Sequence, residues 1–149
     1  FCSCNQLCPL NPIVNSYSFG ESVAVYGDVA IAGSSKDNDK GIQAGGAYVY
    51  RYNGLSWGLD AKLVASDGRA NQFFGYSASL SDGLSIIGAY QDNDMRNMAG
   101  AAYVFRYNAT SRQWAQETKL LDPSGTAVDQ FGKSVGISGR IALLGRPND

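Results

Sequence analysis

Two short acidic loops are the parts of this 149-residue sequence best suited to chemistry. Each contains an Asp-Asn-Asp triplet, and the members are Asp37, Asn38 and Asp39 in the first loop and Asp92, Asn93 and Asp94 in the second. Calcium takes about six to eight oxygen ligands from carboxylates, amides and carbonyls, so these residues are candidate calcium ligands. Arg96 stands in the second loop where Gly41 stands in the first, and its charge opposes a cation. The alternative is that these side chains cap turns by accepting hydrogen bonds from nearby backbone amides.

The sequence offers little for catalysis, because it contains no histidine. This excludes Ser-His-Asp and Cys-His nucleophile systems, histidine metal ligands and a histidine general base. Paired carboxylates can hydrolyse glycosides when two acids face each other across roughly 5–9.5 Å. The acids here lie in polar loops that recur along the chain, and a repeated structural unit explains such loops better than a unique active site does. We therefore expect no catalytic residues and no enzyme activity.

Net charge argues against nucleic acid as a partner, and hydropathy argues against a transmembrane segment. Twelve Lys and Arg residues stand against thirteen Asp and Glu residues, which gives a net charge of −1. A nucleic-acid-binding surface needs a basic stripe to neutralise phosphates, so we expect no nucleic acid. The longest apolar runs, such as residues 99–105, are far shorter than the ~20 residues that span a bilayer, so we expect no transmembrane segment.

Cysteines are confined to the first eight residues, at Cys2, Cys4 and Cys8. A zinc site would need a fourth thiolate or a histidine, which the chain lacks. A disulfide-linked extracellular segment fits better, with at least one cysteine free or paired outside the chain because the number is odd. The alternative is three reduced, inert thiols. We take residues 1–18 as a Cys-rich N-terminal segment or linker.

One triplet matches the acceptor pattern for N-glycosylation, Asn108-Ala109-Thr110. It lies at an expected hairpin tip, equivalent to Asn53-Gly54 in the preceding unit, where modifying enzymes have access. We expect a glycan on Asn108, the alternative being an ordinary turn asparagine. Together with the cysteines, this predicts an extracellular or cell-surface location.

The chain repeats itself around three Phe-Gly pairs, spaced 55 and 57 residues apart. These are Phe19-Gly20, Phe74-Gly75 and Phe131-Gly132. A two-residue turn follows eight residues after each Phe, and a further glycine six residues later. We divide the chain into two full units, 19–73 and 74–130, and the truncated start of a third, 131–149.

Each full unit is predicted to contain four short strands. In the first, residues 22–26 and 29–32 flank a Gly-Asp turn, the chemistry of a tight hairpin. Residues 48–52 alternate tyrosines with other residues, and the odd-numbered residues of 57–63 are expected to share one face. No stretch shows a helical period. Four-stranded repeats of this length predict a β-propeller, in which every blade packs its aromatic face on the next.

The Phe-Gly pairs are expected to make the blade-to-blade contact. A phenylalanine wedged between blades gains on the order of 1.5–3 kcal/mol from burial, while the glycine lets a neighbouring backbone approach. The arginines in matching strand positions, Arg51 and Arg106, are most simply taken as solvent-facing, and the alternative is a role in an interface.

The sequence resembles the FG-GAP repeats, the blades of integrin α-subunit-like propellers. The resemblance rests on residues 19–23, the Gly27-Asp28 turn, residues 29–33 and the acidic loop that follows. It implies an all-β propeller with about two and a third four-stranded blades of an incomplete ring, and calcium in the acidic loops. Propellers need about 4–8 blades to close, so missing sequence or another chain must complete the ring.

These observations favour a non-catalytic extracellular structural or adhesion segment. Its expected partners are other protein chains, further blades of the same protein or copies of itself. The alternative is an accessory propeller module of a secreted or cell-surface hydrolase, whose catalytic domain would lie outside this chain.

Overall fold

The computed structural model describes residues 16–148, which form two four-stranded sheets and two smaller ones. The first four-stranded sheet contains β2 (Val23–Tyr26), β3 (Val29–Ser34), β5 (Gly46–Tyr52) and β6 (Trp57–Leu63). The second contains β7 (Phe74–Ser81), β8 (Leu84–Ala89), β9 (Ala101–Asn108) and β10 (Gln113–Leu120). The smaller sheets pair β11 (Val135–Ser138) with β12 (Ile141–Leu144), and β1 (Ser16–Tyr17) with β4 (Lys36–Asp37).

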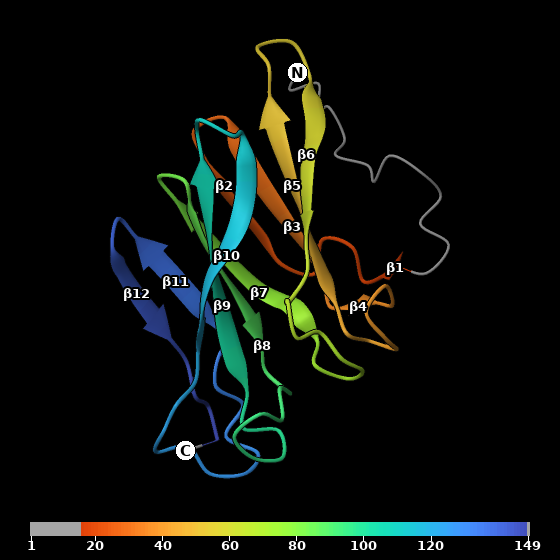
Figure 1. The fold of residues 1–149 in the computed structure, drawn as a ribbon, viewed down its shortest axis with the longest axis vertical. Helices are drawn as coiled ribbons and strands as arrows, with labels where there is room; N and C mark the ends of the chain where they lie inside the picture. Colours follow the sequence, from red (N-terminus) through yellow and green to blue (C-terminus); the bar gives the residue numbers. More distant parts are fainter. Residues whose placement is uncertain (1–15, 149) are drawn as a thin grey trace, which may run out of the picture.

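The two large sheets are antiparallel meanders that lie side by side, followed by the β11–β12 hairpin (Figure 1). We call them blade 1 and blade 2, and the hairpin the start of blade 3. No helix occurs within residues 16–148, and these residues do not close a ring. The predicted fold, an incomplete β-propeller of about two and a third blades, is confirmed.

The hairpins turn where the sequence predicted two-residue turns. In blade 2, Asp82 and Gly83 both adopt positive φ angles, of 43° and 72°. Positive φ at both central residues is the requirement of a type I′ turn, whose twist matches that of the flanking strands. Gly27 and Gly139 occupy the corresponding turns with φ angles of 58° and 55°.

Blade 2 packs its aromatic face against the aliphatic face of blade 1. Phe74 is completely buried, and its ring makes edge contacts with Tyr103 at 5.4 Å and Phe105 at 6.0 Å between centroids. These rings share one core with Ile31 and Val49 of blade 1, which are also buried. Edge-to-face aromatic pairs add about 0.5–1.5 kcal/mol beyond the area they bury. The predicted packing of blades through aromatic faces is therefore present between blades 1 and 2.

The glycine after Phe74 brings two backbones into contact. The carbonyl oxygen of Gly75 accepts a hydrogen bond from Ser22 Oγ at 2.8 Å. A Cβ placed on Gly33 would lie only 2.0 Å from that same oxygen. Since no side chain fits such a gap, blade 1 needs glycine at this position.

The same contact recurs one blade further on. The carbonyl oxygen of Gly132 accepts a hydrogen bond from Ser77 Oγ at 2.8 Å, and a Cβ on Gly88 would lie 1.9 Å from it. The repeat in sequence therefore corresponds to a repeat of the blade-to-blade contact, and the role expected of the Phe-Gly glycine is seen in the geometry.

One expectation about strand faces is wrong. In β6, Leu59 pairs with Tyr50 and Ala61 pairs with Val49, so Asp60 is an extra residue in a β-bulge. A bulge moves the residues on either side of it to opposite faces. Leu59 therefore lies on the face of Tyr50, and Ala61 on the opposite face, which packs against blade 2.

Candidate functional site

The two acidic loops connect β3 to β5 in blade 1 and β8 to β9 in blade 2. Their leading aspartates are buried, with Asp37 exposing 1% and Asp92 exposing none of its surface. A buried carboxylate is costly unless it is paired and hydrogen-bonded, so the partners of these two residues decide what the loops do.

Within the blade 2 loop, the acidic and amide side chains cap the turn. Asp92 Oδ1 accepts a hydrogen bond from the backbone N–H of Asp94 at 2.9 Å, and Asn93 Oδ1 accepts one from Met98 at 2.6 Å. The turn-capping role considered from the sequence is therefore present. Two of the five side-chain oxygens of the triplet are thus engaged by the loop itself.

The blade 1 loop has the same capping pattern. Asp37 Oδ1 accepts from the N–H of Asp39 at 3.0 Å, and Asn38 Oδ1 accepts from Gln43 at 2.7 Å. The two loops therefore share their turn caps, although Asp37 also ends the short strand β4, which has no counterpart in the blade 2 loop.

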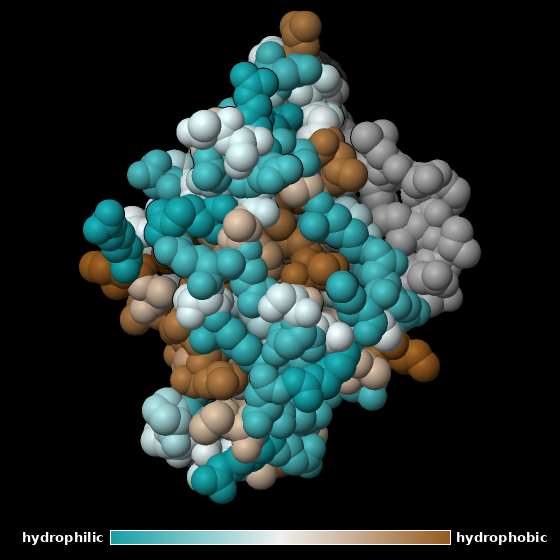
Figure 2. All heavy atoms as spheres, viewed as in Figure 1, coloured by the Kyte–Doolittle hydropathy of each residue, from teal (hydrophilic) through white to brown (hydrophobic). Residues whose placement is uncertain are grey.

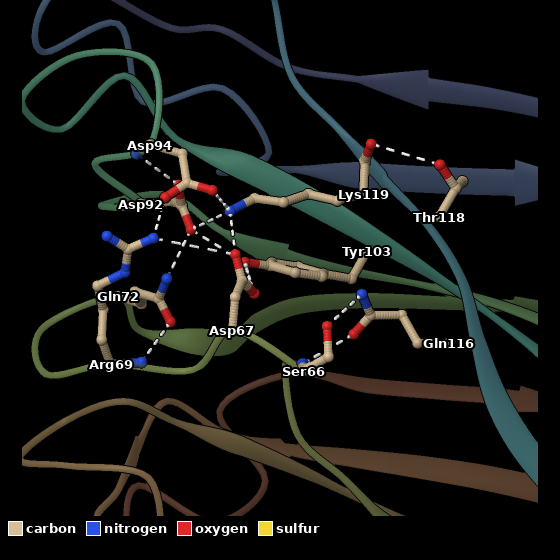
Figure 3. A network of polar contacts seen from close by, with 10 residues as sticks. All are labelled: Ser66, Asp67, Arg69, Gln72, Asp92, Asp94, Tyr103, Gln116, Thr118 and Lys119. Carbon is tan, nitrogen blue, oxygen red and sulfur yellow. Dashed lines mark hydrogen bonds and ion pairs between the residues drawn. The ribbon is translucent and has the colours of Figure 1, made fainter.

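The remaining carboxylate oxygens in blade 2 surround the ammonium group of Lys119 on β10 (Figure 3). Lys119 Nζ lies 2.9 Å from Asp92, 2.5 Å from Asp94 and 2.6 Å from Asp67, which belongs to the linker between the blades. Oxygens of the three carboxylates lie within 4.8 Å of one another. Arg69 adds a second cation through its contact with Asp94. We call Asp67, Asp92, Asp94 and Lys119 the lysine-centred cluster.

Two neutral groups complete the cluster. Gln72 Nε2 donates to Asp92 Oδ2 at 2.7 Å, and the Tyr103 hydroxyl lies 2.9 Å from both Asp92 and Asp67. Lys119 Nζ also lies 5.1 Å from the centre of the Tyr103 ring, within the range of a cation–π interaction.

Blade 1 contains a smaller version of this arrangement. Lys62 Nζ lies 2.7 Å from Asp37 and 2.5 Å from Asp39, and the Tyr48 hydroxyl donates to Asp37 at 2.7 Å. In the part of the chain that the structure describes, Lys62 pairs with two carboxylates rather than three.

The lysines set the protonation of the acids. Burial alone would raise the pKa of Asp37, but hydrogen bonds from Lys62, the Asp39 amide and Tyr48 outweigh it and hold the pKa below its ordinary value. The pKa of Asp67 is lowered in the same way, because Lys119 and Tyr103 outweigh the effect of burial. For Lys62, burial alone would lower the pKa, but the hydrogen bonds that its ammonium donates to Asp37 and Asp39 outweigh burial and raise the pKa. Burial and the neighbouring carboxylates raise the pKa of the Tyr103 phenol.

Comparison with known proteins identifies the repeat that carries these loops. The family model described as FG-GAP repeat matches residues 15–50, 57–105 and 114–149. The chain belongs to the FG-GAP repeat family. Among solved structures, this FG-GAP chain is similar to the crystal structure of Sqt1 from Saccharomyces cerevisiae, with 11% sequence identity and a TM-score of 0.47. That alignment covers 74% of this chain and 27% of the Sqt1 chain, while no curated protein matches the sequence.

The FG-GAP resemblance implied calcium in the acidic loops, and the donor set as arranged does not fit that ion. Calcium needs about six to eight oxygens, and here a positively charged ammonium lies within 2.9 Å of all three blade 2 carboxylates. Within each loop, the three predicted ligands lie together. Asp37 and Asp92 are paired with lysines, however, and Asn38 and Asn93 accept hydrogen bonds from backbone amides.

Sequence reasoning missed the lysines and Asp67. Lys62 and Lys119 were visible as matching positions of the repeat, and that match was the available signal. Asp67 has no such signal, because it comes from the linker after β6 and reaches Lys119 only through the fold.

A groove of about 340 Å³ runs between the hairpin ends of blades 1 and 2. In it, the Arg51 guanidinium lies 4.5 Å from the centre of the Tyr107 ring of blade 2 and pairs with Asp60 at 3.2 Å. Trp114 of blade 2 donates to Asp60 at 3.1 Å. Arg51 is therefore not the solvent-facing residue that the sequence favoured. It has the interface role considered as the alternative, because it contacts Tyr107 of blade 2 as well as Asp60 of blade 1. The β-bulge in β6 supplies the partner of Arg51, because Asp60 is the extra residue of that bulge.

The predicted glycosylation residue, Asn108, is exposed at the end of β9. Its Oδ1 accepts from the N–H groups of Thr110 at 2.9 Å and Ser111 at 3.1 Å, as Asn53 does in blade 1. Glycosylation stays a prediction. Cys2, Cys4 and Cys8 lie outside the described residues. Between residues 16 and 148 the structure contains no helix able to span a lipid bilayer.

Proposed function

We propose that this FG-GAP chain is a non-catalytic extracellular structural or adhesion segment that binds protein surfaces through the sheet faces at the two ends of its blade array. The observation that carries the proposal is a contrast between equivalent positions. The apolar positions of Leu80 and Ile86, which are buried in blade 2, are exposed at the array ends as Val25 and Leu143.

At the start of the array, the exposed positions lie on β2. Val25 exposes 66% of its surface, whereas its counterpart in blade 2, Leu80, exposes 7%. Val23, on the same face, exposes 70%. Because Leu80 is buried against blade 1, a similar apolar sheet face would cover Val25 in the same manner.

At the other end, the exposed positions lie on β12. Leu143 exposes 75% of its surface, whereas its counterparts Ile86 and Ile31 expose none and 1%. Ile141, beside it, exposes 73%, and hydrophobic atoms gather on the side of the molecule where the β11–β12 hairpin lies (Figure 2). Contiguous exposed apolar patches are typical of interaction surfaces.

The expected occupants are sheets of the same kind, from further blades of the same protein or from another chain. The two ends are complementary in the same way as blades 1 and 2. Val25 lies on the sheet face that corresponds to the one blade 2 turns toward blade 1, and Leu143 lies on the face that corresponds to the one blade 1 turns toward blade 2. Contact between these two different faces is head-to-tail, which builds rings or open arrays.

The absence of catalysis is supported by how the acids are used. The cluster carboxylates of Asp67, Asp92 and Asp94 all pair with Lys119, and Asp37 pairs with Lys62. Carboxyl groups whose pKa is lowered, as it is for Asp37 and Asp67, are poor general acids near neutral pH.

An association measurement tests the proposal. We expect the weight-average mass of the chain in sedimentation velocity to rise with concentration, and Leu143→Asp to abolish this rise because it places a charge on the apolar face. Leu55→Asp is the matched control, because Leu55 exposes 84% of its surface at a turn away from that face. A wild-type chain that remains monomeric and binds no apolar dye would contradict the proposal.

The extracellular part of the proposal has its own test. Expressed in a secretory pathway, the chain is expected to carry one glycan that N-glycosidase removes and that Asn108→Gln prevents. A secreted chain without that glycan would remove the main support for an extracellular location. Retention of the unmodified chain inside the cell would contradict that location.

A further inference from the structure

We propose that Lys119 is a built-in replacement for a metal ion: its ammonium group occupies a divalent-cation site formed by Asp67, Asp92 and Asp94, and makes blade 2 independent of calcium. The family resemblance leads one to expect a metal in this loop, and the structure places a covalently attached cation there instead.

The geometry is that of a filled coordination site. An ammonium has three N–H donors, and Lys119 has three carboxylates at 2.5–2.9 Å, so each donor has one acceptor. The carboxylates come from two segments far apart in sequence, the linker after β6 and the β8–β9 loop, and converge on a side chain from a third segment, β10. A metal ion bound by the same carboxylates would hold the linker and the β8–β9 loop together in the same way.

The charge count also favours a cation at this point. Three carboxylates carry a charge of −3, Lys119 contributes +1, and Arg69 contributes a further +1 through Asp94. Removing the lysine charge leaves −2 around a site whose carboxylate oxygens remain within 4.8 Å of one another. A divalent cation would neutralise that charge, whereas in the wild-type chain it would lie beside an ammonium and gain little.

Blade 1 supplies an internal comparison. Lys62 occupies the equivalent position but holds only Asp37 and Asp39 within the described residues. Two carboxylates make a weaker divalent site than three. Removal of Lys62 should therefore destabilise blade 1 without producing a tight metal site.

The consequence for the molecule is a linker that is fixed at all calcium concentrations. Asp67 belongs to the segment that joins the blades, and its bonds to Lys119 and Tyr103 anchor that segment to blade 2. A metal-dependent loop would release the linker when calcium is removed, and a lysine-filled one does not.

The test compares the wild-type chain with Lys119→Met, which keeps the length and apolar stem of the side chain but removes its charge. Terbium(III) serves as the metal probe, because Tyr103 lies beside the site and can sensitise its luminescence on excitation of the phenol ring. Calcium is then added as a competitor. Melting temperature is measured in parallel in EDTA and in excess calcium.

For the wild-type chain we expect no sensitised terbium luminescence at this site and the same melting temperature in EDTA and calcium. For Lys119→Met we expect a lower melting temperature in EDTA and one equivalent of bound terbium that calcium displaces. Calcium at tenfold its dissociation constant should raise the melting temperature by about 4 °C.

Two further variants keep the result specific. Asp67→Asn combined with Lys119→Met should lose the metal response, since one carboxylate is gone. Lys62→Met should be destabilised with no such response. A wild-type chain that binds calcium stoichiometrically at Asp92 and Asp94 would overturn the proposal without any variant, and so would a folded Lys119→Met chain that binds no terbium.

Discussion

Single lysine residues decide the chemistry of the acidic loops. Asp37 and Asp92 are buried carboxylates, and a buried carboxylate is costly unless it is paired with a positive charge. Lys62 and Lys119 supply that charge from the last strand of each blade. The loops are therefore fixed by ion pairs whose strength depends on the ionisation of the acids.

This gives a prediction for acid stability. The folded-state pKa of Asp37 is lowered below its unfolded value of about 3.9, so its contribution is complete above that value and is lost as pH falls through the folded pKa. We expect Asp37→Asn to lower the free energy of unfolding at neutral pH and to flatten its decline below about pH 4. Urea denaturation at a series of pH values measures both effects.

The exposed Asp28 provides the control. Asp28→Asn removes a carboxylate whose contact with Arg51 is long, at 3.4 Å, and it should leave the acid slope unchanged. Equal acid slopes for wild type and Asp37→Asn would contradict the role given to Lys62.

The residue scale is where sequence reasoning was least complete. The triplets at 37–39 and 92–94 were located correctly as loops between the second and third strands of each unit. Their partners were not, because Lys119 follows Asp92 by 27 residues and Asp67 precedes it by 25, and only folding brings the three together. A matched lysine in two units has many uses, and sequence alone does not choose among them.

At the scale of strands, the blades are defined by close backbone contact as much as by side chains. The Gly88 position faces the Gly132 carbonyl of the next hairpin with no room for a Cβ. The Ser77 hydroxyl donates a hydrogen bond to that carbonyl and borders the same gap. Blade-to-blade spacing therefore depends on glycine at this strand position.

Gly88→Ala should consequently destabilise the chain by about 1–3 kcal/mol, the range for an overfilled core, because its Cβ would lie 1.9 Å from a carbonyl oxygen. Gly58→Ala in β6 is the matched control, since its Cβ would meet nothing within 4 Å, and it should change stability by less than about 0.5 kcal/mol. Chemical denaturation of the two variants gives both values. Similar values for the two substitutions would mean that the blades are not in contact at Gly88.

Strand positions were largely predictable because alternation and Gly-Asp turns are local signals. The bulges were not, since Asp60 and Glu117 look like ordinary polar strand residues. In the structure each is an extra residue on the last strand and pairs with an arginine of the strand before it, Arg51 or Arg106. Bulges depend on the partner strand, which a one-dimensional pattern does not show.

At the scale of the whole molecule, one aromatic core joins two blades and exposed apolar residues remain at both ends of the array. The core contains Phe74 and Tyr103 from blade 2 together with Val49 from blade 1. The exposed residues include Val25 at one end and Leu143 at the other. The repeat, predicted from Phe-Gly spacing, explains both features, because each blade covers one neighbour and is covered by the next.

Native-state hydrogen exchange of Phe74→Ala tests most directly whether the blades pack face to face. The substitution should cost about 3–5 kcal/mol in global stability, as for other buried phenylalanines. If blades 1 and 2 share the core, amides of β3 and β5 in blade 1 will lose protection together with those of β7 and β9 in blade 2. Unchanged protection in β3 and β5, with loss confined to blade 2, would show that Phe74 does not join the blades.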